Sequence, residues 1–391
     1  MKKTVSFLIV LMLFSTILIV QNAASQEVIK IGHIRPLTGN LAMTSDMMIK
    51  GFDLAFEQAN YQVAGKKIQI VMGDSKGDVQ TAIDVARKMV ENDKVAMIVG
   101  STIIAENAAL GNYINQVGIP QIITTQLPLE IYAANKWAVG VGGTTAQLTS
   151  AMGVYAYEKL GYKKLDVMTQ DTASGRGYLA PFINAFKTKG GQIVQEQYTK
   201  FPCPDFAPYF TTLKDADAVA AWTNGADAIK FLTQYHEMGI AKRLPLVAAY
   251  HGSFLASFTL GALPPAAAEA RVGDYVATPY SPLLENASNK QFVKAIQAKI
   301  KVMPDDTQSA TYQAAMVIME ALKATKGDTN PAKLRQAMLG LSVDGPQGTM
   351  KFDPQSGVAI KTTYICKITK VGKSYIWQPV FQYNNVPPKG L

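Results

Sequence analysis

The sequence predicts an α/β protein made of two doubly wound, parallel-sheet lobes in series. Short apolar runs alternate with amphipathic stretches, several runs are apolar at nearly every position, and the rhythm restarts after Gly142-Gly143. Strands that are apolar throughout are typical of parallel sheets with helices on both faces. A length of 391 residues also fits two domains.

The first unit is a β-α-β-α-β-α-β succession. Its expected strands are residues 29–34, 68–72, 95–99 and 121–124. We expect a helix to begin near Ser45, because Met48, Phe52 and Phe56 recur at helical spacing. Asp78 is the expected N-cap of the next helix. This alternation predicts a parallel sheet.

The second unit repeats the pattern and is followed by a helical region. The expected strands are residues 165–168, 193–194, 218–222 and 246–249. The expected helices are 148–160, one ending near Gly190, 206–213, 226–238, 290–301, 307–323 and 331–339. Two strands, 362–371 and 374–380, close the chain around a Gly372-Lys373 turn. Since no change of composition marks a linker, we expect the chain to cross between the lobes several times.

Residues 1–25 have the layout of a secretory signal. Met1-Lys2-Lys3 is positive, an uncharged apolar run extends to Val20, and Ala23-Ala24-Ser25 offers small residues for cleavage. The apolar run is short for a transmembrane helix, and no cysteine lies near the cut. We therefore expect a mature protein that starts near Gln26 and resides in the periplasm without a lipid anchor.

Charge and cysteine content exclude some classes and leave one question open. The net charge of +9 is spread along the chain. Spread charges favour a solvated surface over nucleic-acid binding, although a mildly positive field can attract an anion. Cys203 and Cys366 could form a disulfide outside the cytoplasm, but their spacing does not decide this. Three histidines and two cysteines show no zinc-binding spacing.

Catalytic motifs are missing from the sequence. It contains no Gly-x-Ser-x-Gly, His-Glu-x-x-His, phosphate-binding Gly-x-x-x-x-Gly-Lys-Ser/Thr or Cys-x-x-Cys motif. Gly140-Val141-Gly142-Gly143 lies between the two units and is better interpreted as a lobe junction than as a dinucleotide fingerprint. We expect no enzymatic activity, no cofactor and no metal.

Ligands of open parallel sheets bind at the carboxyl ends of the strands, so the residues there are the candidate ligand contacts. They are Leu41, Ser101, Thr102, Ile103, Thr124, Thr125, Gln126, Thr172, Ser174, Asn224, Tyr250, His251 and Tyr280. Uncharged donors with apolar and aromatic neighbours suit a small, partly apolar ligand. Tyr250 and Tyr280 could instead be rim packing, and Trp222, at a strand end, is expected in the core.

Several short matches in order make the chain similar to a known family. They are Ile29-Lys30-Ile31-Gly32, Pro36-Leu37-Thr38-Gly39, Ile98-Val99-Gly100-Ser101, Gly118-Ile119-Pro120, Asp171 with Ser174-Gly175-Arg176-Gly177, Asp205-Phe206 and Met238-Gly239-Ile240. From about Val28 onward the chain resembles the solute-binding proteins of bacterial ABC importers, of the leucine/isoleucine/valine-binding (type I periplasmic binding protein) family.

This resemblance implies an organisation and a set of partners. The two lobes would be joined by a three-crossover hinge, with lobe one formed by residues 26–146 plus 276–345 and lobe two by 147–275 plus 346–391. Cys203 and Cys366 would then share a lobe. The implied partners are a small-molecule ligand and an ABC permease in the cytoplasmic membrane, and we expect a monomer.

Departures from the family pattern bear on the ligand. Amino-acid binders of this type hold the ligand carboxylate at positions matching Ile104-Ala105 and Thr125-Gln126, and they have a tyrosine where this chain has Ser174. Their acidic partner for the ligand ammonium is replaced by His251, which could donate to a carboxylate or be an ordinary turn residue. A buried ammonium without an anion is costly. An aromatic or other hydrophobic carboxylate is therefore favoured.

Two alternatives stay open within the same transporter class. The ligand could be a branched-chain or other hydrophobic amino acid. The protein could also be a sensor component that presents its ligand to a receptor instead of a permease.

Overall fold

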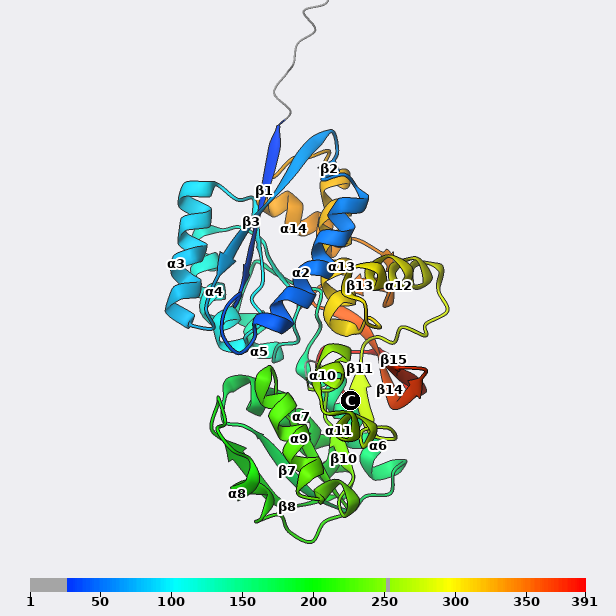
Figure 1. The fold of residues 1–391 in the computed structure, drawn as a ribbon. Coiled ribbons are helices and arrows are strands. Elements are labelled where there is room, and N and C mark those ends of the chain that lie inside the picture. Colours follow the sequence, from blue (N-terminus) through cyan, green and yellow to red (C-terminus); the bar gives the residue numbers. More distant parts are fainter. Residues whose placement is uncertain (1–26, 251–253) are drawn as a thin grey trace, which may run out of the picture.

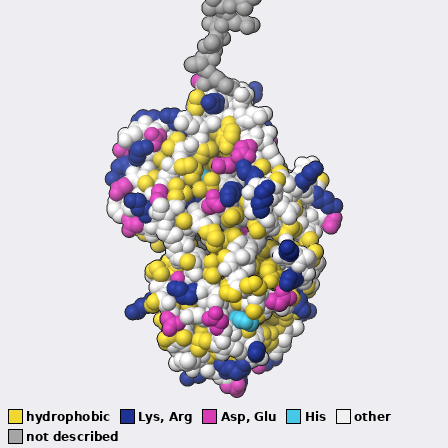
Figure 2. Space-filling model, in the orientation of Figure 1, with side chains coloured by type: hydrophobic (Ala, Val, Ile, Leu, Met, Phe, Trp, Pro, Cys, Tyr) yellow, Lys and Arg dark blue, Asp and Glu magenta, His cyan; other side chains and the backbone are white. Residues whose placement is uncertain are grey.

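The computed structural model describes residues 27–250 and 254–391, so the expected signal at 1–25 and His251 lie outside the described residues. Two α/β lobes lie end to end, and the chain passes between them more than once (Figure 1). Figure 2 shows Lys and Arg side chains interspersed with Asp and Glu over both lobes on the face drawn. No helix in the described part of the chain is long and apolar enough to cross a membrane.

The first lobe is built on a sheet with the strand order β2-β3-β1-β4-β5-β6. Its strands are β1 Val28–Arg35, β2 Gln62–Val63, β3 Lys66–Asp74, β4 Met97–Val99, β5 Gln121–Ile123 and β6 Ala138–Gly140. Its helices are α2 Ala42–Gln58, α3 Val79–Lys88, α4 Ile104–Val117 and α5 Leu129–Ala134, with the π-helix η1 Met89–Asp93 after α3. β1 lies centrally and pairs in parallel with β3 and β4. The carboxyl end of β1 therefore lies beside those of its neighbours.

The second lobe is built on the part of a nine-stranded sheet that has the order β14-β11-β10-β9-β7-β8. Its strands are β7 Lys164–Gln170, β8 Gln192–Thr199, β9 Ala218–Trp222, β10 Leu246–Ala248, β11 Tyr275–Thr278, β14 Ala359–Val371 and β15 Ser374–Val386. Its helices are α6 Thr145–Glu158, α7 Ala173–Thr188, α8 Ala207–Phe210, α9 Ala226–Glu237, η2 Ile240–Lys242, α10 Ser257–Ala262 and α11 Pro265–Glu269. Strands β7 to β11 are parallel, and the antiparallel hairpin β14–β15 adds to that edge.

The chain returns to the first lobe between β11 and β14. This segment holds α12 Ala287–Ile300, α13 Asp306–Ala324, α14 Pro331–Leu339, β12 Val343–Gly345 and β13 Gly348–Phe352. Ile318, Met338, Met350 and Phe352 share one buried core with Phe52 of α2. Strand β11 at Tyr275–Thr278 thus pairs within the second lobe's sheet, and Val343, Met350 and Phe352 pack in the first lobe's core.

Cys203 and Cys366 do lie in the core of the same lobe, but both thiols are free. Each is fully buried. Burial raises the pKa of the Cys203 thiol, and more strongly that of Cys366, because a thiolate would lose its solvation. The two cysteines therefore act as small apolar core residues in this structure.

The side chain of Gln147 hydrogen-bonds two of the strands at the junction between the lobes. Gln147, in the first turn of α6, donates from Nε2 to the carbonyl oxygens of Ala359 at 3.0 Å and Val386 at 2.8 Å. Lys361 is buried beside this junction and donates from Nζ to Oε1 of Gln347 at 2.6 Å. Burial lowers the pKa of Lys361 to about 7, opposed by the nearby Asp306 carboxylate.

Lys361→Met is expected to flatten the pH dependence of stability. In the unfolded chain Lys361 takes up its proton near its ordinary pKa of 10.5, but in the folded protein only near 7. The unfolded state then binds more protons between pH 7 and 10.5, so the wild-type free energy of unfolding should rise with pH there, by up to about 1.4 kcal/mol per pH unit. Urea titrations of both proteins at pH 6 to 10 measure the difference, and parallel profiles would contradict it.

Candidate functional site

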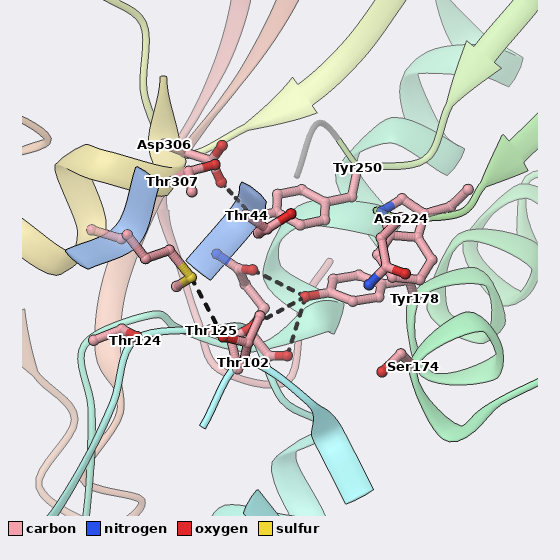
Figure 3. Close-up of a pocket in the computed structure, with 14 residues that line it drawn as sticks. Thr44, Thr102, Thr124, Thr125, Ser174, Tyr178, Asn224, Tyr250, Asp306 and Thr307 are labelled. Carbon is pink, nitrogen blue, oxygen red and sulfur yellow. Dashed lines mark hydrogen bonds between the residues drawn. The ribbon is translucent and has the colours of Figure 1, made fainter. Parts of the chain in front are cut away.

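A cavity lies between the two lobes, next to the carboxyl ends of the strands of both sheets. Its lining residues are Thr44, Met48, Thr102, Thr124, Thr125, Gln126, Ser174, Tyr178, Trp222, Asn224, Tyr250, Asp306, Thr307 and Ala310. Figure 3 shows the threonines of the first lobe on one side, and Tyr178, Asn224 and Ser174 of the second lobe on the other. Both lobes thus contribute to a single binding space.

A buried arginine lies directly behind the first-lobe wall of this cavity. Arg35 is the last residue of β1 and has no exposed surface. Its Nη1 donates to Thr102 Oγ1 at 2.9 Å and lies 3.1 Å from Met48 Sδ, and its Nη2 donates to Thr124 Oγ1 at 2.7 Å. All three of these partners line the cavity. The guanidinium is therefore separated from the cavity by one layer of side chains.

The hydrogen-bond partners of the Arg35 guanidinium are all neutral groups. Its Nε donates to Nε2 of His33 at 2.7 Å. Burial, together with the Arg35 charge, lowers the pKa of His33 well below 6.5, so this imidazole is neutral at pH 7. Within residues 27–250 and 254–391 Arg35 makes no ion pair, and burial lowers its own pKa to about 9. A buried cation without a counter-ion is unfavourable, and an anion in the cavity would relieve this.

The hydroxyl groups of Thr102 and Thr124 connect the buried guanidinium of Arg35 to the cavity. A hydroxyl group that accepts a hydrogen bond from a guanidinium still has its own proton to donate. Thr102 and Thr124 both accept from Arg35, so each hydroxyl keeps a proton to donate. The Thr102 hydroxyl donates to Met48 Sδ at 3.6 Å, a weak acceptor that a carboxylate in the cavity would replace. Donors polarised by a nearby cation form stronger hydrogen bonds with an anionic acceptor. This wall of the cavity is chemically suited to a carboxylate.

The second-lobe wall is aromatic. The Tyr178 ring lies between Trp222, at a centroid distance of 4.4 Å, and Tyr250, at 4.9 Å and nearly parallel. Tyr178 projects from α7, whereas Trp222 ends β9 and Tyr250 lies two residues after the end of β10. Burial raises the pKa of both Tyr178 and Tyr250, so their hydroxyls stay protonated. The Tyr178 ring is tilted by 34° to Trp222 and by 14° to Tyr250, and the three rings together form an aromatic wall against which a hydrophobic ligand can pack.

One acidic residue also lines the cavity. Asp306 is the first residue of α13, and its side chain accepts a hydrogen bond from the Tyr250 hydroxyl. It is 2% exposed. The cavity is therefore lined by one carboxyl group of the first lobe, and the Arg35 guanidinium lies behind Thr102 and Thr124. Among the described residues, no group of three or more His, Cys, Asp or Glu side chains could hold a metal ion.

Direct contacts between the lobes close the cavity. The backbone N–H of Ala226 donates to Asn40 Oδ1 at 2.9 Å, and the Tyr178 hydroxyl donates to Gln126 Oε1 at 3.1 Å. Gly225 has φ +62°, and a Cβ there would lie 2.5 Å from the carbonyl oxygen of Asn40. A glycine is therefore needed where these two loops meet. The structure shows the lobes in a closed arrangement.

The structure brings together seven of the expected site residues at the cavity. They are Thr102, Thr124, Thr125, Gln126, Ser174, Asn224 and Tyr250. Five others lie elsewhere. Ser101 bonds Glu106, Thr172 caps α7, the Tyr280 hydroxyl bonds Asn289 in the first-lobe core, and neither Leu41 nor Ile103 is part of the lining. His251, as stated above, is not described.

Sequence reasoning missed the positive charge of Arg35 and the contribution of Trp222 to the cavity. Arg35 directly follows the expected strand 29–34 but was not a candidate, and Trp222 was expected to be core only. Trp222 does belong to the second-lobe core, but it also lines the cavity. An arginine two residues after His33, at the end of a strand and just before the Pro36 turn, was the available signal.

The fold and the closed cavity define a two-lobed protein that encloses a small ligand between its lobes. A family described as periplasmic binding protein matches residues 28–373, and the chain belongs to this family. The resemblance seen in the sequence is therefore confirmed, as is the fold class.

Individual relatives span almost the whole chain. The Leu/Ile/Val-binding protein homolog 6 of Brucella melitensis biotype 1 is 22% identical over 356 residues, covering 89% of this chain and 90% of the relative. A solute-binding protein of an ABC transporter from Rhodopseudomonas palustris BisB5, solved with 3,4-dihydroxybenzoic acid, has a TM-score of 0.86 and 27% identity, covering 92% of this chain and 98% of that one. The branched-chain amino acid transporter substrate-binding protein LivJ from Streptococcus pneumoniae, solved with isoleucine, has a TM-score of 0.77 and 25% identity, covering 90% and 100%.

Proposed function

We propose that this protein captures a small carboxylate, aromatic or otherwise hydrophobic, and delivers it to an ABC permease. The observation that carries the proposal is the buried, unpaired Arg35 behind the Thr102 and Thr124 hydroxyls. The carboxylate accepts hydrogen bonds from both hydroxyls, and its charge compensates the guanidinium. The hydrophobic part packs against Tyr178 and its stacked neighbours.

Binding and release use hinge motion without any chemical step. Hinge closure is the motion by which periplasmic binding proteins enclose ligands. An open form admits the ligand to the first lobe, and closure forms contacts such as Ala226 to Asn40 that remove the ligand from water. The closed form is the one that a permease recognises. The protein works as a monomer in the periplasm after loss of residues 1–25, needs no cofactor and catalyses no reaction.

The relatives support a carboxylate of this kind. The Rhodopseudomonas palustris protein was solved with 3,4-dihydroxybenzoic acid, an aromatic carboxylate. Its similarity covers both lobes, which supports a related ligand in the same cleft. The aromatic wall of this cavity is the local feature that agrees with such a ligand.

A branched-chain or other hydrophobic amino acid is the second candidate ligand. Asp306 favours it, because a carboxylate in the cavity could pair with a ligand ammonium group. The isoleucine bound to the Streptococcus pneumoniae protein also favours it. Against it, the Asp306 carboxylate already accepts a hydrogen bond from Tyr250 and lies near Lys361.

A thermal-shift panel separates the two candidates. A ligand that binds only the folded state raises the melting temperature in proportion to the logarithm of its concentration over its Kd. We expect benzoate and 4-hydroxybenzoate to raise it, and leucine, isoleucine and benzamide to leave it unchanged. A shift with leucine or isoleucine and none with the aromatic acids would contradict the proposal and favour the second candidate.

Carboxylate affinity should fall at alkaline pH. The ligand anion needs the protonated form of Arg35, whose pKa is lowered to about 9 by burial. Below pH 9 the affinity should be nearly constant, and above it the affinity should fall by up to about tenfold per pH unit, as the guanidinium loses its proton. His33 stays neutral across this range because its pKa is far lower. Calorimetric titrations at pH 7 to 10 measure the dependence, and a constant Kd would contradict it.

A further inference from the structure

Two of the second-lobe residues that line the cavity have a buried polar atom without a hydrogen-bond partner. In the described part of the chain, no group bonds the indole Nε1 of Trp222 or the Oδ1 of Asn224. Both residues line the cavity, and Trp222 is 3% exposed. Buried donors and acceptors are almost always satisfied in native proteins. An unsatisfied pair inside a binding cavity therefore indicates a ligand group that bonds to it.

The local backbone explains why the two groups face the same space. In an extended chain, alternate residues point to the same side. Trp222 ends β9 and Asn224 follows two positions later. Thr223 lies between them and donates its hydroxyl proton to Gln170 Oε1 at 3.0 Å. The Thr223 hydroxyl is thus hydrogen-bonded within the lobe. Trp222 Nε1 and Asn224 Oδ1, on either side of it in the sequence, stay available to a ligand in the cavity.

These groups lie across the cavity from the carboxylate-binding wall. Figure 3 shows Asn224 on the second-lobe side and Thr124 on the opposite, first-lobe side. A rigid ligand whose carboxylate meets Thr102 and Thr124 would direct its far end toward Trp222 and Asn224. A donor and an acceptor on the same wall of the cavity match a hydroxyl group, which both accepts and donates one hydrogen bond.

We propose that Trp222 and Asn224 select ligands with a hydroxyl group at the end opposite the carboxylate. The ligand hydroxyl oxygen accepts from Trp222 Nε1–H, and its proton is donated to Asn224 Oδ1. This inference rests on the proposed function and narrows its ligand class to hydroxylated aromatic acids. Benzoate itself would leave both groups unsatisfied and would bind more weakly.

Matched ligands and matched variants test this selection by calorimetric titration. The ligands are benzoate and 4-hydroxybenzoate. Trp222→Phe keeps a ring beside Tyr178 but removes the N–H, and Asn224→Leu keeps a similar shape but removes the amide. Trp137→Phe is the control, because Trp137 packs against Gly118 in the first lobe and does not line the cavity.

The measured quantity is the ratio of the two Kd values in each protein. We expect wild type and Trp137→Phe to prefer 4-hydroxybenzoate by about tenfold or more, and both cavity variants to reduce this preference to about threefold or less. Benzoate binding to each variant shows that its site is folded. An equal affinity of wild type for the two acids, or a preference that both variants retain, overturns this inference but does not contradict the proposed function. If wild type binds neither acid, an aromatic carboxylate is not the ligand of the proposed function, and the inference falls with it.

Discussion

Arg35→Met is expected to weaken carboxylate binding by roughly 100-fold or more, a loss of about 3 kcal/mol. The guanidinium is the cation behind the Thr102 and Thr124 hydroxyls, and methionine replaces it with an apolar chain of similar length. The unliganded protein should become no less stable, because the variant removes a buried charge that has only neutral partners. A gain of about 1–3 kcal/mol in the free energy of unfolding is expected.

Calorimetric titration and urea unfolding of the same samples measure both effects. The control is Arg87→Met, since Arg87 lies on the exposed side of α3 and pairs with Asp84. That variant should leave the Kd unchanged. If Arg35→Met kept wild-type affinity, the charge would have no part in binding. A large loss of stability would instead make Arg35 a structural residue.

The double variant Thr102→Val/Thr124→Val is expected to reduce both affinity and stability. Each valine removes a hydroxyl that would donate to the ligand, and each also leaves an Arg35 N–H without an acceptor. We expect a loss of about 1–3 kcal/mol per threonine in the free energy of binding, and a similar loss in that of unfolding. The stability change is thus opposite in sign to that of Arg35→Met, although both variants bind weakly.

The triple variant Arg35→Met/Thr102→Val/Thr124→Val tests whether the stability effects of these substitutions depend on one another. Once Arg35 is methionine, the two threonines no longer serve a buried guanidinium, so adding the valines should cost less stability than in the wild-type background. Such non-additivity is expected of groups in one hydrogen-bond network. The exposed Thr188→Val serves as the control for the threonine substitution itself. Strictly additive stability changes would mean that the three side chains do not form a network.

The elements with strong patterns were predictable from the sequence. Asp78 does cap α3, its side chain accepting from the Thr81 N–H at 2.8 Å, and α14 covers the expected residues 331–339. Short elements were missed, among them β6, α10 and the β12–β13 hairpin. Three- to six-residue segments carry too little periodicity to be recognised, and their form depends on tertiary partners.

The site could be predicted in part, because strand ends were the right places to search. The position of a residue after a strand does not determine where its side chain points. Ser101 and Thr102 are adjacent, yet Ser101 bonds Glu106 within the lobe whereas Thr102 bonds Arg35 at the cavity. Tyr280 follows β11 but packs into the first-lobe core. Arg35 was missed because a charged residue is by default expected at the surface, and only its neighbours in space reveal its burial.

The most direct test of the central claim is the ratio of the affinities of wild type for 4-hydroxybenzoate and 4-hydroxybenzamide at pH 7, measured by calorimetric titration. The two ligands have nearly the same shape and differ in the charge that Arg35 would compensate. A buried, hydrogen-bonded charge pair should favour the acid by roughly 100-fold or more. Equal affinities, or tighter binding of the amide, would contradict the account.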